Sequence, residues 1–283
     1  MDTKEISKCM RTQWAGRSIA FFEEIDSTNT MAKRLGEQGV PEGTLVIADC
    51  QTGGKGRRGR EWFSPAGTGI WMTLLLKPRL LPDKVSAITL VAALSVCKAI
   101  RRVTGLETMI KWPNDLVMNG KKVCGILTEM SLEPDHIGYV VLGIGINVNQ
   151  TEFPEELPHA WSLAMAAREA VLSVTGETGQ DERTETEAGM FSREEIIARI
   201  WECFEEDYGI YLRTGDMSGL RGQYEAHLAN LGCAVRVLAP SGEWAGAAEG
   251  IADSGELLVR DEAGVLRMVN SGEVSVRGVY GYT

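Results

Sequence analysis

The sequence predicts an α+β protein, in which a mixed sheet with helices covering it is followed by a small antiparallel β-barrel. Two patterns carry this prediction. Apolar strand-like segments alternate with segments of helical periodicity over residues 19–146, which is typical of a sheet with helical cover. From Leu231 onward the chain changes to short alternating strands broken by Gly and Ser. Since 283 residues suffice for one large and one small domain, we expect domains at residues 1–230 and 231–283.

The first half of the chain supplies three predicted strands and two predicted helices. The strands are expected at residues 19–25, 44–50 and 69–76, which are rich in branched apolar and aromatic side chains. The first helix opens at residues 26–29 (DSTN), whose short side-chain oxygens suit a helix N-cap. The second helix is expected over residues 83–103, where apolar residues recur at helical spacing.

Three further strands are expected in succession, at residues 108–111, 122–130 and 136–146. Pro113 cannot continue a central ladder and biases Trp112 toward an extended backbone. The segment KWPND therefore marks a strand end that turns into a tight connection.

The remainder of the large domain holds an insertion and two helices. Residues 174–189 are polar and without apolar periodicity, which predicts a flexible insertion. Ser192 is expected to cap a long helix, and a short helix leads to His227.

The charge balance excludes some classes of function. Lys and Arg number 29 against 39 Asp and Glu, a net charge of -10 that argues against coating nucleic acid or anionic membrane. The N-terminus shows no apolar signal core and no uncharged run is as long as a membrane span. About 18 residues precede the first predicted strand, too few for a three-helix DNA-binding domain. We expect a cytoplasmic protein without DNA or membrane partners.

The six cysteines predict buried, reduced thiols rather than a metal site or disulfides. They form no C-x-x-C pair and have no closely spaced His. They are Cys9, Cys50, Cys97, Cys124, Cys203 and Cys233.

One stretch, QTGGKGRRGREW at residues 51–62, concentrates positive charge in this acidic chain. Its glycines allow backbone N–H groups to close on a ligand, and its arginines offer planar forks for phosphate or carboxylate. It does not match the G-x-x-x-x-G-K-[ST] pattern of a Walker A loop. The stretch predicts an anion site of another kind, formed by a lid that is mobile when empty, although a solvated charge run is the bland alternative.

Two other stretches carry polar residues on predicted strands. In IKWPNDLVMNGKKVCGIL, Lys111 and Lys122 flank one carboxylate, Asp115, and Gly125 permits close approach of a ligand. In VVLGIGINVNQ, an apolar strand ends in glycines and in Asn147, whose amide could bind an adenine edge. Edge-blocking lysines and core packing are the structural alternatives.

Together these stretches resemble the biotin protein ligases, also called biotin-[acetyl-CoA-carboxylase] ligases. The resemblance rests on five motifs in the family's order: DSTNT, QTGGKGRRGREWFSP, KWPNDL, KKVCGIL and GIGINVN. It implies a class II aminoacyl-tRNA synthetase-like catalytic domain with an SH3-like C-terminal barrel. It also implies that biotin and Mg²⁺-ATP form biotinyl-5'-AMP, which a lysine of a biotin carboxyl carrier domain then attacks. A homodimer is possible on the family pattern.

The resemblance also implies roles for individual residues. Catalytic roles are expected for Lys122, Arg57, Asp115 and Lys111. Biotin contacts are expected from Ser27, Thr28, Asn29, Gln51, Gly54, Lys55, Gly56, Arg57, Lys122 and Gly125. Adenylate contacts are expected from Arg57, Arg58, Arg60, Trp62 and Asn147. No protein residue is assigned as an Mg²⁺ ligand, and the ion is expected to bind through the ATP phosphates.

Lys55 departs from the family's usual arginine, which keeps the charge but loses the bidentate fork. A lipoate or octanoate ligase also activates its substrate as an adenylate and stays an alternative. A nucleic-acid-binding module that uses KGRRGREWF as a basic aromatic patch is more distant. An interaction protein without activity is the third alternative.

Overall fold

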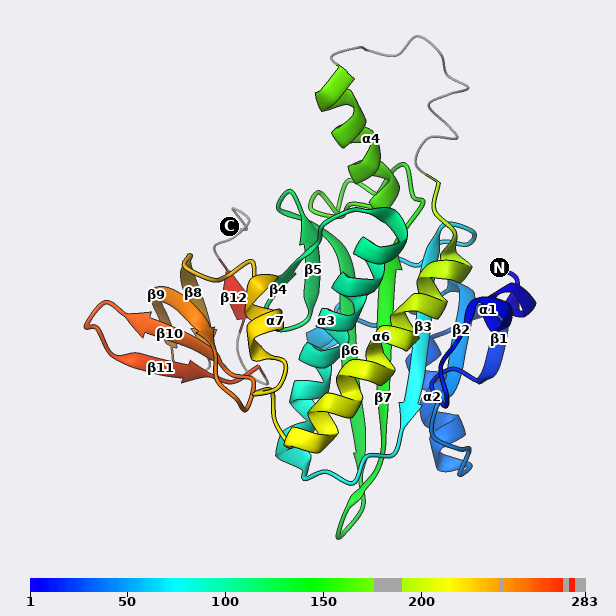
Figure 1. Cartoon of the computed structure of the whole chain (residues 1–283), viewed down its shortest axis with the longest axis horizontal. Coiled ribbons are helices and arrows are strands. Elements are labelled where there is room, and N and C mark those ends of the chain that lie inside the picture. Colours follow the sequence, from blue (N-terminus) through cyan, green and yellow to red (C-terminus); the bar gives the residue numbers. More distant parts are fainter. Residues whose placement is uncertain (176–189, 240–241, 272–274, 278–283) are drawn as a thin grey trace.

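The computed structural model describes residues 1–175, 190–239, 242–271 and 275–277. A seven-stranded sheet in the order β1-β2-β3-β7-β6-β5-β4 forms the body of the protein (Figure 1). Its strands are β1 (Ser18–Ile25), β2 (Thr44–Gln51), β3 (Gly69–Leu76), β4 (Met109–Lys111), β5 (Asp115–Met118), β6 (Lys121–Leu132) and β7 (Ile137–Asn147). The β1–β2 pair is parallel and the other neighbouring pairs are antiparallel, so the predicted mixed sheet is confirmed.

Helices cover both faces of this sheet, which explains why its central strands are largely apolar. Every residue of β3 is buried. On one face α3 (Val85–Thr104) and α6 (Arg193–Thr214) pack together across the sheet (Figure 1). On the other face α2 (Thr28–Glu37) packs against β2, β3 and β7. A strand buried on both faces has no solvent side, so it reads as a continuous apolar run.

The predicted strands and helices agree with the structure to within about two residues at each end. Ser192 caps α6 as expected, because its side chain accepts a hydrogen bond from the Glu195 N–H. Ser27 does stand at the N-cap of α2, but it makes no capping hydrogen bond. Instead the Gln51 side-chain oxygen accepts from the Thr28 N–H at 2.9 Å. This distant cap leaves the Ser27 hydroxyl available to the site described below.

Three elements were not predicted. The helix α1 (Thr3–Cys9) buries only Ile6, and seven residues are too few for a clear helical period. Strand β5 begins two residues after Pro113, where only a tight connection was expected. The Trp112–Pro113 peptide in the connection from β4 to β5 is cis. The helix α4 (Leu163–Thr175) projects away from the sheet (Figure 1). It includes residues 174 and 175, so the first two residues of the predicted flexible insertion are helical instead. The rest of that prediction falls on residues 176–189, which lie outside the described part.

The C-terminal part forms a five-stranded antiparallel sheet, which confirms the predicted change of architecture. Its order is β11-β10-β9-β8-β12. The strands are β8 (Ala234–Ala239), β9 (Gly242–Ile251), β10 (Leu257–Asp261), β11 (Leu266–Val269) and β12 (Ser275–Arg277). The SH3-like topology and the boundary at residues 230 and 231 stay predictions.

Hydrogen bonds connect the C-terminal sheet to the large domain. The Trp112 indole N–H donates to the Gly255 carbonyl at 3.1 Å. Glu225, on the short helix α7 (Arg221–Ala226), accepts from the Ile251 N–H at 3.0 Å. These contacts place the C-terminal sheet beside the strands that carry the KWPND motif (Figure 1).

All six cysteines are free of disulfides. Cys97, Cys124 and Cys203 are buried as predicted, but Cys9, Cys50 and Cys233 are only partly buried. Burial raises the pKa of Cys97 to about 12 and that of Cys203 to about 11, so both remain neutral thiols. Within the described residues, no helix combines the length and the apolar character needed to cross a membrane.

Candidate functional site

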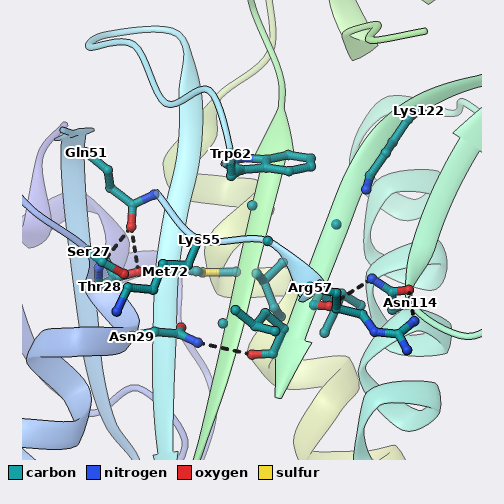
Figure 2. Close-up of a pocket in the computed structure, with 17 residues that line it drawn as sticks. Ser27, Thr28, Asn29, Gln51, Lys55, Arg57, Trp62, Met72, Asn114 and Lys122 are labelled. Carbon is teal, nitrogen blue, oxygen red and sulfur yellow. Dashed lines mark hydrogen bonds between the residues drawn. The ribbon is translucent and has the colours of Figure 1, made fainter. Parts of the chain in front are cut away.

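The candidate site is a pocket on the sheet, between the N-terminus of α2, the loop that follows β2, and strands β6 and β7 (Figure 2). Residues from all five family-like motifs meet there although they span more than 100 positions of sequence. The lining comprises Ser27, Thr28, Asn29, Gln51, Lys55, Gly56, Arg57, Trp62, Met72, Asn114, Lys122, Gly125, Ile126, Leu127, Gly143, Ile144 and Gly145. Nine of the predicted site residues therefore share one cavity with Trp62.

One end of the pocket is polar and uncharged. Both the N–H and the hydroxyl of Thr28 donate to the Gln51 side-chain oxygen, at 2.9 and 3.1 Å. The Gln51 amide nitrogen donates to the Ser64 hydroxyl at 2.8 Å. Behind them the buried Thr73 hydroxyl contacts Asn29 Oδ1 at 2.7 Å and Thr28 Oγ1 at 2.8 Å. These bonds hold the polar groups in fixed directions, which suits recognition of a ligand with amide-like groups.

The glycine-rich loop is folded as a short hairpin over the pocket. The Trp62 N–H donates to the Gly54 carbonyl at 2.9 Å, and the Gly56 N–H donates to the Arg60 carbonyl at 2.7 Å. One turn of 3-10 helix, Arg57–Gly59, forms the hairpin tip. The loop thus has an ordered closed form; its mobility in the empty protein stays a prediction.

Gly54 is required by this closed form. A Cβ on Gly54 would lie 2.4 Å from the Trp62 carbonyl oxygen and 2.7 Å from Ser64 Oγ. Since Gly54 is buried beneath the loop, its predicted part in the site is to let the loop approach the pocket rather than to bind through a side chain.

Arg57 reaches across the pocket to the opposite wall (Figure 2). Its guanidinium donates to Asn114 Oδ1 at 2.9 Å and to the backbone carbonyl of Ser271, in the C-terminal domain. Burial lowers the pKa of Arg57 from its usual value, and the nearby Asp115 carboxylate opposes that shift. Arg57 stays charged, because an arginine pKa starts above 12. A cation is therefore held at the end of the pocket opposite the polar cluster.

Lys122 supplies a second cation at this end. Its Nζ lies 2.7 Å from Asp115 Oδ1 and 5.0 Å from the centre of the Trp62 ring. Asp115 starts β5 and pairs in register with Gly125 of β6, so backbone pairing brings the two charged side chains together. Both are about three-quarters buried, with side-chain exposures of 27% for Lys122 and 21% for Asp115, so solvent screens the pair incompletely.

Trp62 forms part of the pocket wall and rests on two glycines. A Cβ on Gly125 would lie 2.8 Å from the Trp62 ring, and one on Gly145 would lie 2.5 Å from its Nε1. The indole nitrogen is buried and makes no hydrogen bond among the described residues. The glycines of β6 and β7 thus create the space in which the indole lies.

A second hollow shares Trp62 and Lys122 with the first. It is lined mainly by apolar groups of the segment after β7, together with Arg60, Trp62, Lys122 and Asn147. The Asn147 amide nitrogen donates to the Trp161 carbonyl at 2.9 Å. Its carbonyl accepts from Gln150 at 3.4 Å. Asn147 thus lines the hollow but both ends of its amide already hold the surrounding chain.

Four predicted residues line neither hollow: Gly54 and Asp115, which adjoin the pocket as described above, and Lys111 and Arg58. Lys111 is on β4, where it pairs in register with Asp115, and it is not part of the lining. Arg58 is exposed at the hairpin tip, with a left-handed φ of 58°. Arg60 is exposed too, but it borders the second hollow.

Sequence reasoning missed several lining residues. Asn114 lies within the KWPND motif, and its position between Pro113 and Asp115 could have identified it as a lining residue. Met72 is one apolar residue of a buried strand, and nothing in its sequence context distinguishes it. Glu129 contacts the pocket residue Asn29 from the middle of β6. In the parts of the chain that are described, no group of three or more His, Cys, Asp or Glu is arranged to hold a metal ion.

Comparison with known proteins agrees with the geometry. The family model described as "Biotin/lipoate A/B protein ligase family" matches residues 21–147. The model described as "Biotin protein ligase C terminal domain" matches residues 231–277. The first match includes four of the five motifs in full and the fifth up to Asn147, and the second covers the five-stranded C-terminal sheet.

Three relatives illustrate the similarity. The bifunctional ligase/repressor BirA of Bacillus subtilis is 36% identical over 274 residues, which cover 96% of this chain and 78% of that protein. The biotin--[acetyl-CoA-carboxylase] ligase of Paracoccus denitrificans is 35% identical over 245 residues, or 84% and 92% of the two chains. The biotin protein ligase from Aquifex aeolicus, solved in complex with biotin and ATP, superimposes with a TM-score of 0.73 at 31% identity, covering 93% of this chain and 99% of that one. The chain therefore belongs to the biotin/lipoate A/B protein ligase family, as one of its biotin protein ligases.

Proposed function

We propose that this protein is an ATP-dependent biotin protein ligase, which forms biotinyl-5'-AMP and transfers biotin to a lysine of a biotin carboxyl carrier domain. One observation carries the proposal: a single pocket has a polar uncharged end, an apolar middle and a cationic end. Biotin has the same order of groups, with a ureido ring, an apolar thiophane and valeryl chain, and a carboxylate. The relative solved with biotin and ATP supports the assignment.

The uncharged end suits the ureido ring. The Ser27 hydroxyl, Thr28 and Asn29 lie there with Gln51. Met72, Ile126 and Ile144 line the apolar middle, where the thiophane ring and the acyl chain would lie. The biotin carboxylate would then reach Lys122 and Arg57, at the end where the first reaction occurs.

In the first step a carboxylate oxygen of biotin attacks the α-phosphorus of ATP, and pyrophosphate leaves. Two anions must approach, so fixed cations stabilise the transition state. A unit-charge pair 4 Å apart is worth about 4 kcal/mol at an effective dielectric of about 20. Lys122 and Arg57 would supply this attraction, and the Mg²⁺ carried by ATP would balance the leaving pyrophosphate.

The adenine would occupy the second hollow, where Trp62 offers an aromatic surface. Since the Asn147 amide already bonds Trp161 and Gln150, its direct contribution would be to hold the segment that closes this hollow. Arg60 would lie at the hollow's edge, near the phosphates. Arg58 and Lys111 border neither hollow. Any role for them would come from direct contact with the bound carrier domain or nucleotide.

In the second step the carrier lysine nitrogen attacks the biotinyl carbonyl, and AMP leaves. The lysine must first lose a proton, and a carboxylate near the reacting carbonyl can accept it. Asp115 is the carboxylate closest to Lys122, at 2.7 Å, which supports such a role. Lys122 would stabilise the AMP phosphate as it leaves.

A lipoate or octanoate ligase is the second candidate, since the same family model includes both kinds of enzyme. A lipoyl or octanoyl group has no ureido ring, so it would leave the polar end unsatisfied. A site built to bond a polar group rejects an analogue that lacks it by on the order of 10⁴. This difference decides between the two candidates.

The test is ATP–pyrophosphate exchange by the full chain with biotin, lipoate or octanoate, followed by transfer to a carrier domain detected by mass spectrometry. We expect exchange with biotin alone and a single biotinylated lysine on the carrier. Equal exchange with lipoate, or none with biotin, would overturn the proposal. Homodimerisation and cytoplasmic location are further predictions, open to sedimentation and fractionation.

A further inference from the structure

We propose that Glu129 is a positioning residue for the biotin site, and that together with Lys33 it fixes which end of the Asn29 amide faces the ligand. The inference rests on the proposed function and deepens it. Glu129 lies in the middle of β6, beyond the KKVCGIL motif, and its carboxylate touches the far side of the pocket wall. Through Asn29 it would select a ligand that presents an N–H donor at the polar end.

The carboxylate of Glu129 holds two side chains of α2 at once. Its Oε1 accepts from Lys33 Nζ at 2.6 Å, and its Oε2 accepts from Asn29 Nδ2 at 2.9 Å. Asn29 and Lys33 are four residues apart on one helix, so they project from the same side. Glu129 and Lys33 are both about two-thirds or more buried, with exposures of 28% and 34%. The ion pair between Glu129 and Lys33 is therefore partly shielded from solvent on both sides, unlike an exposed surface pair.

This arrangement uses both protons of the Asn29 amide nitrogen. One goes to Glu129, and the other goes to the Leu127 carbonyl at 3.3 Å, where Figure 2 shows the nitrogen directed. Turning the amide over would place Asn29 Oδ1 against a carboxylate and a carbonyl, both of which are acceptors. The charge of Glu129 thus decides the orientation of the amide.

Glu129 keeps this charge at neutral pH. Burial by itself would raise the pKa of Glu129, but the hydrogen bonds from Lys33 and Asn29 outweigh burial and lower it below its usual value. An ionised carboxylate only accepts hydrogen bonds, so it can hold only the nitrogen of Asn29.

Among the bonded groups of Thr28, Asn29 and Thr73, the acceptors therefore outnumber the protons. The Thr73 hydroxyl has one proton, which faces both Asn29 Oδ1 at 2.7 Å and Thr28 Oγ1 at 2.8 Å. The Thr28 hydroxyl proton is directed to Gln51 at 3.1 Å. One acceptor of the cluster therefore lacks a donor, and an N–H of the ureido ring can supply it. Gly143 makes room for Asn29 Oδ1 in the pocket wall, since a Cβ there would lie 2.1 Å from it.

The variant that tests this is Glu129→Gln, which keeps the shape but can present either an oxygen or an NH₂ to Asn29. Once the amide is no longer fixed, we expect the KM for biotin in ATP–pyrophosphate exchange to rise about tenfold. The KM for ATP and the kcat should change less than about twofold. Lys33→Ala should also raise the KM for biotin, whereas Lys33→Arg, which keeps the charge, should leave it close to the wild-type value.

Glu133→Gln is the matched control, because it makes the same change just after β6, where the carboxylate is exposed and pairs with His136. This control should leave the KM for biotin unchanged. A double-mutant cycle with Asn29→Ala separates positioning from a direct effect. If Glu129 acts through Asn29, then Glu129→Gln should add nothing to the KM of the Asn29→Ala enzyme.

Two results would overturn the inference while the proposed function stands: a wild-type enzyme active with biotin whose Glu129→Gln form keeps its KM, or additive effects in the cycle. A wild-type protein without biotin-dependent exchange would instead overturn the proposed function, and this inference with it.

Discussion

At the scale of single residues, glycines shape the site as much as the charged side chains do. Gly125 and Gly145 lie on neighbouring strands, paired in register, and both are in contact range of the Trp62 indole. Gly143 makes the same kind of room for Asn29. In each case a side chain from another part of the chain occupies the volume where a methyl group would be.

Gly145→Ala tests this packing. The new Cβ would lie 2.5 Å from Trp62 Nε1, closer than real Cβ contacts, so the indole must move. Because Trp62 borders the second hollow, we expect the KM for ATP to rise by about tenfold, a loss of about 1.4 kcal/mol in binding. Steady-state exchange kinetics measure the change. Gly222→Ala on α7 is the control, since nothing lies near its Cβ, and an equal effect there would contradict the packing argument.

Lys122→Ala tests the cationic end. Removing one preorganised charge from the transition state costs about 10²- to 10³-fold in rate, so we expect exchange to fall by about 10³. The neighbouring Lys121→Ala removes the same charge outside the pocket lining and should stay within about threefold of wild type. Near-normal exchange by the Lys122 variant would contradict its placement at the reacting groups.

At the scale of elements, the two long helices are joined by a buried charged cluster away from the site. Asp207 on α6 is 3% exposed and accepts from Lys98 Nζ at 2.6 Å and from the Ser95 hydroxyl at 3.0 Å, both on α3. Removing the lysine would leave the carboxylate buried without its counter-ion, which costs more than the pair contributes. Lys98→Met should therefore lower the free energy of unfolding by about 3 kcal/mol in urea titration.

Arg101→Met is the matched control on the same helix. Its ion pair with Glu107 is more than half exposed at both partners, so its loss should change stability by less than about 1 kcal/mol. Equal destabilisation by the two variants would show that burial does not distinguish these pairs.

The elements that sequence predicted and those it missed differ in length and in what surrounds them. Helix α3 is long enough for its apolar spacing to be read directly. Strand β5 has four residues, and only its pairing with β4 and β6 makes it a strand. The capping of α2 shows the same limit. The DSTN cluster marked the start of the helix, but the side chain that accepts the Thr28 N–H is Gln51, at the end of β2.

At the scale of the whole molecule, the site joins parts of the chain that ligands would hold together. Arg57 connects the glycine-rich loop to Asn114 of the sheet and to Ser271 of the C-terminal domain. A tightly retained adenylate would add contacts to the same elements. Ligand binding to the folded state alone stabilises it, by about 4 kcal/mol when the ligand is at a thousand times its dissociation constant.

We therefore expect a modest rise in Tm with biotin alone and a much larger rise with biotin and Mg²⁺-ATP together, because the adenylate is formed in place. Thermal unfolding with biotin, with ATP, with both, and with both plus EDTA measures this. EDTA should return the shift to the value for biotin alone. Additive shifts from the separate ligands would argue against a trapped intermediate.

By itself the sequence determined the fold class, the family and most residues of the pocket, because apolar periodicity, glycine patterns and short motifs are local properties of the chain. Only the tertiary structure decided which of those residues line the pocket and which side chains they contact. It put Trp62 on the glycines of β6 and β7, moved Lys111 and Arg58 outside the pocket, and brought in Asn114. It also revealed Glu129 behind Asn29. Such contacts join residues far apart in sequence, and side-chain direction and hydrogen-bond pairing arise only when the sheet brings them together.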